Sequence, residues 1–322
     1  MTTLVASAVW TQLFWTSVVA GGMLYGVPLM FTALGETISE RAGVLNIGLE
    51  GMMLLGAYVG FLGTYYSGSV WVGFLTGILA GMLGSLFMVV LCVWLGLDQI
   101  VVGIAITLAG EGLTSVLYQA RFSSTEPRLA AAPVNPIPGL DRIPVLGKPI
   151  NGQFPLFSQP LIVYLGLAFA VFLAWMFRRT NMGLNLRAAG EKPEALDAAG
   201  VSVVATRSYA ALATGALAGL GGAYLSIVGT GGFQTFLTQG QGFMAIVMTM
   251  LGRGRPLAVV AGSLLFSMAY SVPTSLDLAG IHISVDIVHM LPFVAIMLSL
   301  IVFGRRAYLP PALALPYVRG AR

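Results

Sequence analysis

Residues 178–207 read RRTNMGLNLRAAGEKPEALDAAGVSVVATR and form the one well-charged segment between long apolar runs on both sides. The segment holds five of the chain's sixteen basic residues. Inside it, Pro193 suits the first position of a helix, Glu194 favours the positive helix end, and Gly200 is a natural terminator. We therefore predict a short helix at residues 193–199.

The predicted helix presents Ala195, Ala198 and Ala199 on one face, because residues three and four apart are neighbours on a helix surface. Side chains this small allow another protein to approach the backbone closely. A two-turn helix is too short to be stable alone, so it must pack on something. The alternative is that the segment is a solvated connector between two membrane helices.

The composition indicates an integral membrane protein. Of the 322 residues, 57% are apolar and only 9% are charged, with a mean hydropathy of +0.89, so little of the chain can face water. Forty-one glycines suit helices that pack closely in lipid. One cysteine, Cys92, and two histidines, His282 and His289, exclude an intrachain disulfide and a Cys- or His-rich metal site.

Two further function classes are excluded by what the sequence lacks. It has no basic stripe that would fit nucleic acid. It also lacks the phosphate-loop pattern G-x-x-x-x-G-K-[ST], so the chain has no visible means of binding ATP. We expect no cofactor and no catalytic site, and the energy for any transport must come from a partner or an ion gradient.

Apolar runs predict an all-α, polytopic membrane protein with a single transmembrane domain over residues 1–322. An α-helix needs about 20 apolar residues to cross the hydrocarbon core. We predict about nine spans, at residues 13–34, 44–66, 70–95, 99–119, 160–177, 208–229, 237–252, 256–272 and 286–303. The seventh is short and is either a full span or a re-entrant half-helix. Residues 1–12 carry no Lys or Arg, so the first run is kept as a membrane helix and not a signal peptide.

The basic residues predict the orientation, because cytoplasmic loops hold the excess of Lys and Arg. Placing residues 178–207 inside leaves twelve basic residues on the cytoplasmic side and four outside. The N-terminus is then outside and the C-terminus inside. Residues 121–159 become an external loop that holds seven of the sixteen prolines, a composition typical of extended structure. This loop is either a connector or a surface on which a substrate-binding protein lands.

The second informative stretch is GETISERAGVLNIGLEG, residues 35–51, where charges and glycines interrupt apolar sequence. Unwound backbone at membrane depth is tolerated only where it lines a cavity or is buried in protein, so polar groups such as Asn46 can meet a substrate there. Glu50 is a functional candidate, because an ionisable group inside a span costs about 2.5–3.5 kcal/mol. The structural alternative pairs Glu50 with Arg41 or with backbone N–H groups freed at the broken helix.

Other polar residues inside the spans are weaker candidates. Glu111 lies between two glycines and either contacts substrate or forms a hydrogen bond in helix packing. Gln239 and Gln241 suggest a polar turn at the outer membrane face, which is a gate or an interfacial cap. The stretches Gly56-Ala-Tyr58 and Gly222-Ala-Tyr224 lie in small-residue-rich helices that we expect to run in opposite directions, as in an inverted repeat.

Several of these stretches resemble one family. Residues 187–200, RAAGEKPEALDAAG, resemble the coupling loop of ABC-importer permeases of the branched-chain amino acid, simple-sugar and nucleoside group, where G-E-N-P-x-A-A-x-x-A-G is usual. Lys192, Leu196 and Asp197 depart from that pattern and leave the helix intact. Residues 40–53, ERAGVLNIGLEGMM, are similar to the signature at the start of the second helix in nucleoside and simple-sugar permeases. The stretches QIVVG at 99–103 and PALALPYVRGAR at 311–322 extend the resemblance.

The resemblance implies the non-catalytic permease subunit of an ATP-driven importer in a bacterial inner membrane. Nucleosides or related ribose-containing or simple sugars are the implied substrates. The implied partners are an ABC ATPase, a second homologous permease and an extracytoplasmic substrate-binding protein. In the family the coupling loop docks into a groove of the ATPase, which implies that role for Arg187, Gly190, Glu191, Pro193, Glu194, Ala195, Ala198, Ala199 and Gly200.

The position of polar groups within the spans gives candidate residues of the substrate path: Asn46, Glu50, Glu111, Gln239 and Gln241. Alternating access would then move the break near residues 46–50 in response to the ATPase. The competing function class is an ion-coupled secondary transporter that uses Glu50 and Glu111 as proton or sodium sites.

Overall fold

The computed structural model describes residues 12–122, 126–138, 157–278 and 309–318, together with four isolated positions between 290 and 301. Regular structure in these residues is almost wholly helical. The elements are α2 (Gln12–Arg41), α3 (Leu49–Ser67), α4 (Val70–Met88), the π-helical η1 (Val89–Trp94), α5 (Gln99–Phe122), β1 (Asn135–Pro136), β2 (Ser158–Gln159), α6 (Leu161–Arg179), α7 (Asn181–Glu191), α8 (Pro193–Ala198), α9 (Val203–Tyr224), the π-helical η2 (Leu225–Gly229), α10 (Gln241–Leu251) and α11 (Pro256–Leu278).

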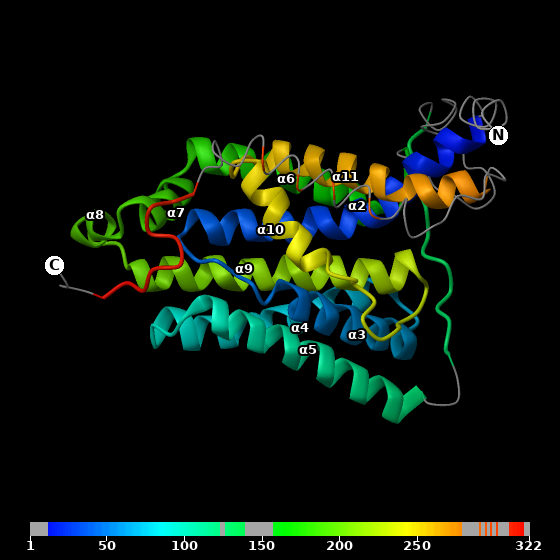
Figure 1. Ribbon diagram of the computed structural model, residues 1–322, viewed down its shortest axis with the longest axis horizontal. Coiled ribbons are helices and arrows are strands. Elements are labelled where there is room, and N and C mark those ends of the chain that lie inside the picture. Colours follow the sequence, from blue (N-terminus) through cyan, green and yellow to red (C-terminus); the bar gives the residue numbers. More distant parts are fainter. Residues whose placement is uncertain are drawn as a thin grey trace.

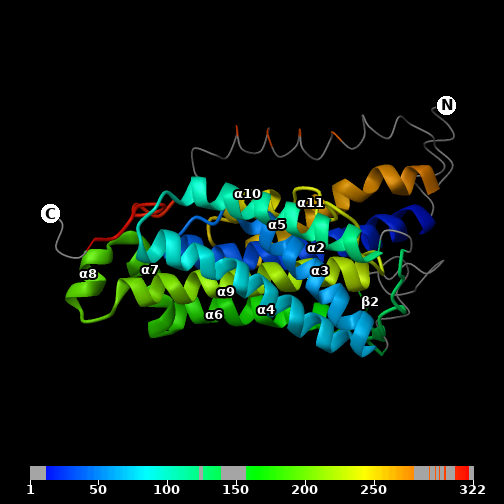
Figure 2. The ribbon, with the colours of Figure 1, turned by 90° about the horizontal axis from the view of Figure 1, so that it is seen from below.

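The long helices lie side by side along the longest axis of the molecule (Figure 1). Helix α2 packs against α9 and α11, and α9 also packs against α3 and α4. Helices α7 and α8 lie at one end of the bundle, and the described beginning of α2 lies at the other (Figures 1 and 2). This arrangement is an all-helical bundle with its largest apolar clusters around α2, α3 and α9.

Among the described residues, six helices are long and apolar enough to cross a membrane: α2, α4 with η1, α5, α6, α9 with η2, and α11. The second predicted span corresponds to α3, which begins at Leu49 and not at residue 44. The predicted span 286–303 lies outside the described residues, apart from isolated positions. A total of nine spans therefore stays a prediction.

Helices α3 and α9 pack backbone to backbone, which only glycine permits at these positions. The backbone of Gly219 occupies the place where a Cβ on Gly56 would lie, and one turn further Ala223 stands in the same relation to Gly60. The contact moves four residues toward the C-terminus in both helices, from Gly56 and Gly219 to Gly60 and Ala223, so the two helices run parallel. The expectation that the Gly56 and Gly222 stretches run in opposite directions is wrong, and so is the inverted repeat drawn from it.

The first predicted span, residues 13–34, ends too early. Helix α2 continues to Arg41, so Glu36 and Glu40 lie on helix and not in an unwound segment. The interruption covers only residues 42–48, in which Gly43 adopts a φ of 85°. Most of these residues are buried, which agrees with the rule that irregular backbone at membrane depth must be enclosed by protein.

A second interruption precedes α10, which spans Gln241–Leu251 and not residues 237–252. The Gly231 carbonyl accepts a hydrogen bond from Leu129 in the segment after α5, at the end opposite α8. The Gly254 carbonyl accepts one from Arg41 Nε at 2.8 Å, at the end where α2 finishes. Residues 230–254 therefore run from one end of the bundle to the other, half irregular and half helical, and do not turn back.

Candidate functional site

The expected short helix exists as α8, Pro193–Ala198, with Ala199 as its cap and Gly200 at a φ of 82° just beyond it. The segment before it was expected to be a loop, and this is wrong, because α7 covers Asn181–Glu191. The Thr180 hydroxyl accepts a hydrogen bond from Gly183 N–H at 3.2 Å and begins α7. That N-cap threonine is the signal by which the sequence could have revealed the helix.

Helix α8 has one buried and one exposed face. Pro193 and Leu196 are buried, and Leu196 packs with Ala189 and Val203 in a small apolar cluster. The predicted coupling residues on the outer side are exposed: Glu191, Glu194, Ala195, Ala198, Ala199 and Gly200. A helix too short to be stable alone is thus held by its inner side, and its small-residue face is left open.

Three other predicted coupling residues are not available on that face. Pro193 is buried under α8, and Gly190 is buried where the Arg41 carbonyl leaves no room for a Cβ. The Gly190 carbonyl accepts a hydrogen bond from Ala312 N–H at 2.9 Å. Arg187 is partly buried. Gly190 and Pro193 therefore hold α7 and α8 in position and are not part of a surface that a partner protein could contact.

Arg207, which the sequence did not single out, ties this end of the molecule together. Its guanidinium is buried and donates to the carbonyls of Ala42 at 3.1 Å, Ala189 at 3.2 Å, Ala312 at 3.3 Å and Leu315 at 2.7 Å. A planar guanidinium has five donors in a fixed geometry, so it can hold several carbonyls at once. Arg207 thereby links α7, the first interruption and the chain near its C-terminus.

Glu50 lies in the first turn of α3 and is buried. Its carboxylate accepts hydrogen bonds from the Thr238 hydroxyl, from Gly240 N–H at 2.7 Å and from Gly242 N–H at 2.6 Å. The free N–H groups and the positive end of α10 stabilise a negative charge at this position. Backbone N–H groups therefore bind Glu50, as the structural alternative proposed. They belong to the start of α10, however, and not to the break before α3.

Gln239 and Gln241 lie beside Glu50 because they flank the glycine that it binds. Along α3, Glu50 lies seventeen residues from Ser67, about 25 Å at 1.5 Å per residue, so the pair lies far from that end of the bundle, with Gln239 exposed at its surface. The expectation of a turn at the outer membrane face stays a prediction, and the structure places the turn beside the start of α3. Gln239 Oε1 accepts from the Tyr270 hydroxyl at 3.3 Å, and Gln241 Oε1 is buried with no hydrogen-bond partner among the described residues.

The two remaining path candidates differ. Asn46 builds the first interruption, because its Oδ1 accepts from Gly48 N–H at 3.1 Å. Glu111 is partly exposed on α5, and the adjoining Gly110 packs against the backbone of Gly51. The structure therefore brings Glu50, Glu111, Gln239 and Gln241 to one level of the bundle. Asn46 lies in the first interruption, four residues before Glu50.

The chain matches a family described as "Branched-chain amino acid transport system / permease component" over residues 18–300. The chain belongs to this permease family. It is 32% identical to guanosine ABC transporter permease protein NupQ of Bacillus subtilis, over 95% of this chain and 97% of that one. It is 31% identical to nucleoside ABC transporter permease protein NupC of Lactococcus lactis, over 94% and 96%.

A further relative is glucose ABC transporter permease protein TsgB13 of Haloferax volcanii, 26% identical over 80% of this chain and 69% of that one. No solved structure matches the permease. Membership of the family and the six apolar helices make the chain a multi-pass membrane protein and the permease subunit of an ABC importer.

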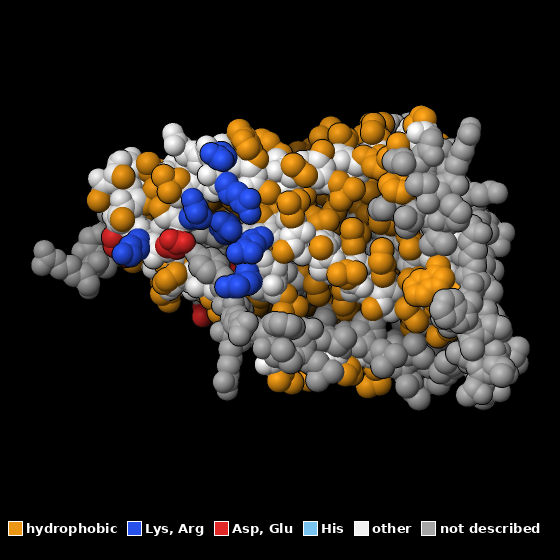
Figure 3. Space-filling view, turned by 90° about the horizontal axis from the view of Figure 1, so that it is seen from above, with side chains coloured by type: hydrophobic (Ala, Val, Ile, Leu, Met, Phe, Trp, Pro, Cys, Tyr) orange, Lys and Arg blue, Asp and Glu red, His pale blue; other side chains and the backbone are white. Residues whose placement is uncertain are grey.

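Basic side chains of the permease gather toward the α8 end, as Figure 3 shows for one face. Arg41 ends α2, and Arg178 and Arg179 end α6, close to where α7 begins. Arg253 and Arg255 lie in the turn between α10 and α11. Cations at the C-terminal ends of α2, α6 and α10 are stabilised by the negative partial charge of those helix ends. These helix ends lie toward the end of the bundle that carries α8.

The sequence also did not single out the serines of α11 as a group. Ser263, Ser267, Ser271 and Ser275 recur at every fourth residue and are all buried. Four-residue spacing places them on one stripe of the helix, against α2. The Ser271 hydroxyl donates to the Val18 carbonyl on α2 at 2.8 Å. This spacing is a signal that the sequence carried and that identifies the α2–α11 contact.

Proposed function

We propose that this permease imports nucleosides, or related ribose-containing or simple sugars, as the membrane-spanning subunit of an ATP-driven importer. The observation that carries the proposal is its similarity along nearly the whole chain to two permeases named for guanosine and nucleosides. The glucose permease among its relatives supports the wider substrate class. ATP is hydrolysed by a partner ATPase, and an extracytoplasmic protein delivers the substrate to a pair of similar permeases.

In this proposal α8 is the element that receives the motion of the ATPase. Its exposed alanines, Ala195, Ala198 and Ala199, allow close approach of a partner, and its buried side is fixed to α7 and α9. Arg207 joins the same unit to the Ala42 carbonyl at the start of the first interruption. A displacement of α8 is therefore passed to residues 42–48 through hydrogen bonds and packed backbone, and not through a flexible loop.

The α8 end is cytoplasmic, the N-terminus is outside and the C-terminus is inside. The basic residues at the α8 end support this orientation, because cytoplasmic ends hold the excess of Lys and Arg. Cysteines placed at Asp197 and at Glu126 in a Cys92→Ala background test it with an impermeant thiol reagent on intact cells. The Glu126 position should react and the Asp197 position should not. Reaction at Asp197 from outside would overturn the orientation.

The substrate passes the level at which Glu50, Glu111, Gln239 and Gln241 meet, close to the break that contains Asn46. Glu50 holds the start of α10 and thereby sets the position of Gln239 and Gln241. Movement of the first interruption shifts Glu50, and the amides move with it. Three donors, the Thr238 hydroxyl and the N–H groups of Gly240 and Gly242, fix the Glu50 carboxylate in this position.

The decisive experiment enlarges the open face of α8. We expect Ala198→Trp to block docking by steric overlap, because overpacking a fitted interface costs roughly 1–3 kcal/mol. The variant should insert and hold its permease partner but no longer co-purify with the ATPase or support substrate-stimulated ATP hydrolysis. The matched control is Ala120→Trp, at an exposed alanine near the C-terminal end of α5, and it should retain both properties. Retention of both by Ala198→Trp would make α8 a solvated connector.

An ion-coupled carrier would differ in its dependence on partners. It would transport alone and lose activity when a protonophore or sodium removal collapses the gradient, whereas an ABC permease transports nothing without its ATPase. Uptake of radiolabelled nucleoside should therefore vanish with a catalytically dead ATPase and persist in the presence of a protonophore. Uptake by the permease alone would establish the carrier in its place.

A further inference from the structure

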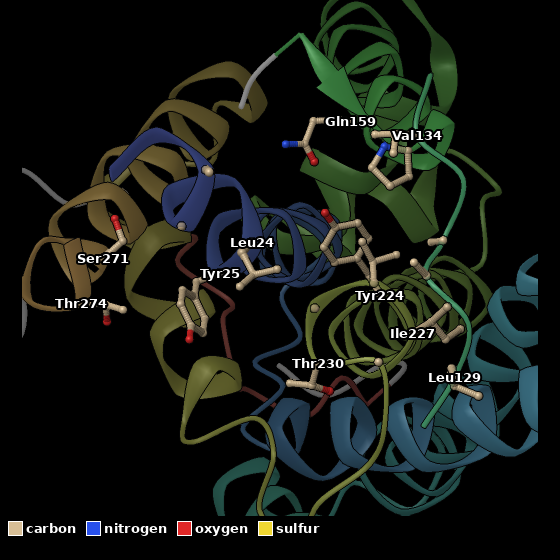
Figure 4. A pocket seen from close by; sticks show the side chains of 18 of the residues that line it. Leu24, Tyr25, Leu129, Val134, Gln159, Tyr224, Ile227, Thr230, Ser271 and Thr274 are labelled. Carbon is tan, nitrogen blue, oxygen red and sulfur yellow. The ribbon is translucent and has the colours of Figure 1, made fainter. Parts of the chain in front are cut away.

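A cavity of about 510 Å³ opens at the end of the bundle opposite α8. It lies between the first half of α2, the end of α9 with η2, α11, and the described parts of the 121–159 segment (Figure 4). This volume falls within the range of about 300–1,000 Å³ that is typical of small-molecule sites. None of the residues that line it belongs to the substrate path assigned above.

The lining is polar but almost uncharged. Hydroxyl groups come from separate elements, among them Ser17 on α2, Tyr224 on α9 and Thr274 on α11. The described lining residues include no carboxylate and a single cation, Arg128, whose Nη1 donates to the Thr230 carbonyl at 3.5 Å. A cavity of this kind favours a neutral solute with several hydroxyl groups over a metal cation or a phosphorylated compound.

Tyr224 is the most specific feature of the cavity. Its ring is only 1% exposed, and buried tyrosine hydroxyls need a polar partner. In Figure 4 the Tyr224 hydroxyl and the side-chain amide of Gln159 point toward the same part of the cavity. A ligand at this position would meet a phenol hydroxyl and an amide, and Tyr25 lines the same cavity from another part of its wall.

The matching tyrosine of Gly56-Ala-Tyr58 shows that the motif alone does not create a cavity. Tyr58 packs edge-on against Phe233 with ring centroids 5.2 Å apart, inside an aromatic cluster with Phe61. The same three residues therefore fill space in α3 and border open space in α9. Of the two stretches, only Gly222-Ala-Tyr224 borders the cavity.

Tyr25 separates this cavity from the substrate path. Its side chain lines the cavity on one side, and on the other it lines a space of only about 20 Å³ together with Gln239 and Gln241. Its ring meets Tyr270 edge-on, with centroids 5.3 Å apart. A solute in the cavity is thus one aromatic pair away from the start of α10.

We propose that this cavity is a binding site, within a single permease subunit, for an intact neutral nucleoside before it passes Tyr25 to the Glu50 level. The inference rests on the proposed function and adds a place and a chemical class to it. Aromatic rings suit the base by stacking, and the hydroxyl groups and the Gln159 amide suit the sugar. Nucleotides are disfavoured, because a phosphate group would enter a lining that has one cation, Arg128, among its described residues.

The test measures protection of a cysteine in the cavity of the complete transporter. Thr274→Cys is made in a Cys92→Ala background, and the rate of reaction with an impermeant thiol reagent is followed with guanosine, ribose or guanosine monophosphate present. We expect guanosine to slow labelling several-fold, ribose to slow it less, and the monophosphate to leave it unchanged. Ser67→Cys, exposed at the end of α3 and outside the cavity, should show no protection.

Removal of one hydroxyl sharpens the test. Adding Tyr224→Phe should raise the guanosine concentration needed for protection about fivefold, the effect of losing one hydrogen bond of ordinary strength. Tyr58→Phe, the same change in the matching motif, should leave it unaltered. Unprotected labelling in a transporter that still takes up guanosine would overturn this site and leave the proposed function standing. Absence of nucleoside uptake by the unmodified transporter would overturn the proposed function itself and the ligand named here with it.

Discussion

Two stretches of the permease interrupt helical structure within the bundle, and they are built differently. Residues 42–48 separate α2 from α3, and residues 230–240 separate η2 from α10. Each leads into a helix that begins inside the molecule (Figure 1). Glu50 joins the two beginnings, because it lies in the first turn of α3 and binds the first N–H groups of α10.

The first interruption is closed by side chains that satisfy its own backbone. Asn46 N–H donates to Glu36 Oε1 at 3.1 Å, and Leu45 N–H donates to Gln99 Oε1 at 2.8 Å. Asn46 Oδ1 in turn accepts from Gly48 N–H. Buried backbone groups that find such partners make irregular structure as rigid as a helix.

The second interruption is held less firmly. Phe236 and Gln239 adopt φ values of 59° and 48°, which cost energy for residues other than glycine, and Phe236 is 56% exposed. Its hydrogen bonds to α3 converge on the one carboxylate of Glu50. Segments with few buried contacts open before the rest of a structure. From this difference we infer that the second interruption changes its conformation more readily than the first, and that Glu50 holds it in place.

The largest effect on stability is expected from a substitution that pushes the start of α10 away from the start of α3. A Cβ on Gly242 would lie 2.6 Å from the Cα of Glu50, and backbone atoms on both sides leave no flexible group that could yield. We expect Gly242→Ala to cost about 3 kcal/mol or more, at the upper end of overpacking, and to lower the thermal midpoint in detergent together with uptake.

The control for this substitution is Gly112→Ala on α5. Nothing lies within 4 Å of a Cβ at Gly112, and alanine favours helix more than glycine does. Its thermal midpoint should equal or exceed that of the unmodified permease. If Gly242→Ala were equally stable, α3 and α10 would not be in the close contact described here.

A smaller effect is expected from Glu50→Gln. The amide keeps one acceptor but sets an NH₂ group against a backbone N–H, so we expect a loss of about 2 kcal/mol in stability and reduced uptake. Membrane insertion should be unharmed, because a buried charge is removed and not added. Glu111→Gln, at a partly exposed carboxylate on the same level, should change the thermal midpoint less. An unchanged midpoint for Glu50→Gln would mean that Glu50 does not hold α10.

Much of this architecture could be predicted from local signals. Pro193, Gly200 and the alanine spacing located α8 to within one residue, because helix ends depend on neighbouring residues alone. The importance of Glu50 was also visible, because a carboxylate in an apolar run is costly wherever its partner lies.

The partners of these residues could not be predicted, because they lie far away in the sequence. Glu50 is bound by residues about 190 positions further on, and Arg207 by carbonyls from 18 to 165 positions away. The position of Gln239 and Gln241 beside Glu50 could not be predicted for a related reason. A half-helix after irregular chain has the composition of a short span, and only the packing of Gly242 on Glu50 fixes its level.

Asn46→Ala should have a smaller effect than Glu50→Gln, because it removes one acceptor and not a group that serves three donors. Loss of the bond to Gly48 N–H should cost about 1 kcal/mol. Hydrogen exchange should show faster opening at residues 42–48 and little change at residues 230–240. Equal acceleration in both would contradict the separate construction of the two interruptions.

The smallest effect on stability, and one of opposite sign, is expected from Gln239→Gly. The left-handed backbone at Gln239 costs about 1–2 kcal/mol for a residue with a Cβ, and glycine's greater freedom in the unfolded chain offsets about 0.4–1 kcal/mol of that relief. A net gain of about 0.5 kcal/mol should therefore appear as a slightly higher thermal midpoint. Uptake should nevertheless fall, because the amide that faces Tyr270 is removed from the substrate path.

Gln239→Asn separates the two contributions. Asparagine tolerates the left-handed region better than most residues and keeps an amide, so this variant should retain more uptake than Gln239→Gly at similar stability. A strained residue kept where glycine would be more stable is explained by the function of its side chain. If Gln239→Gly transported as well as the unmodified permease, the amide would have no such function, and the second interruption would serve only to end η2 and begin α10.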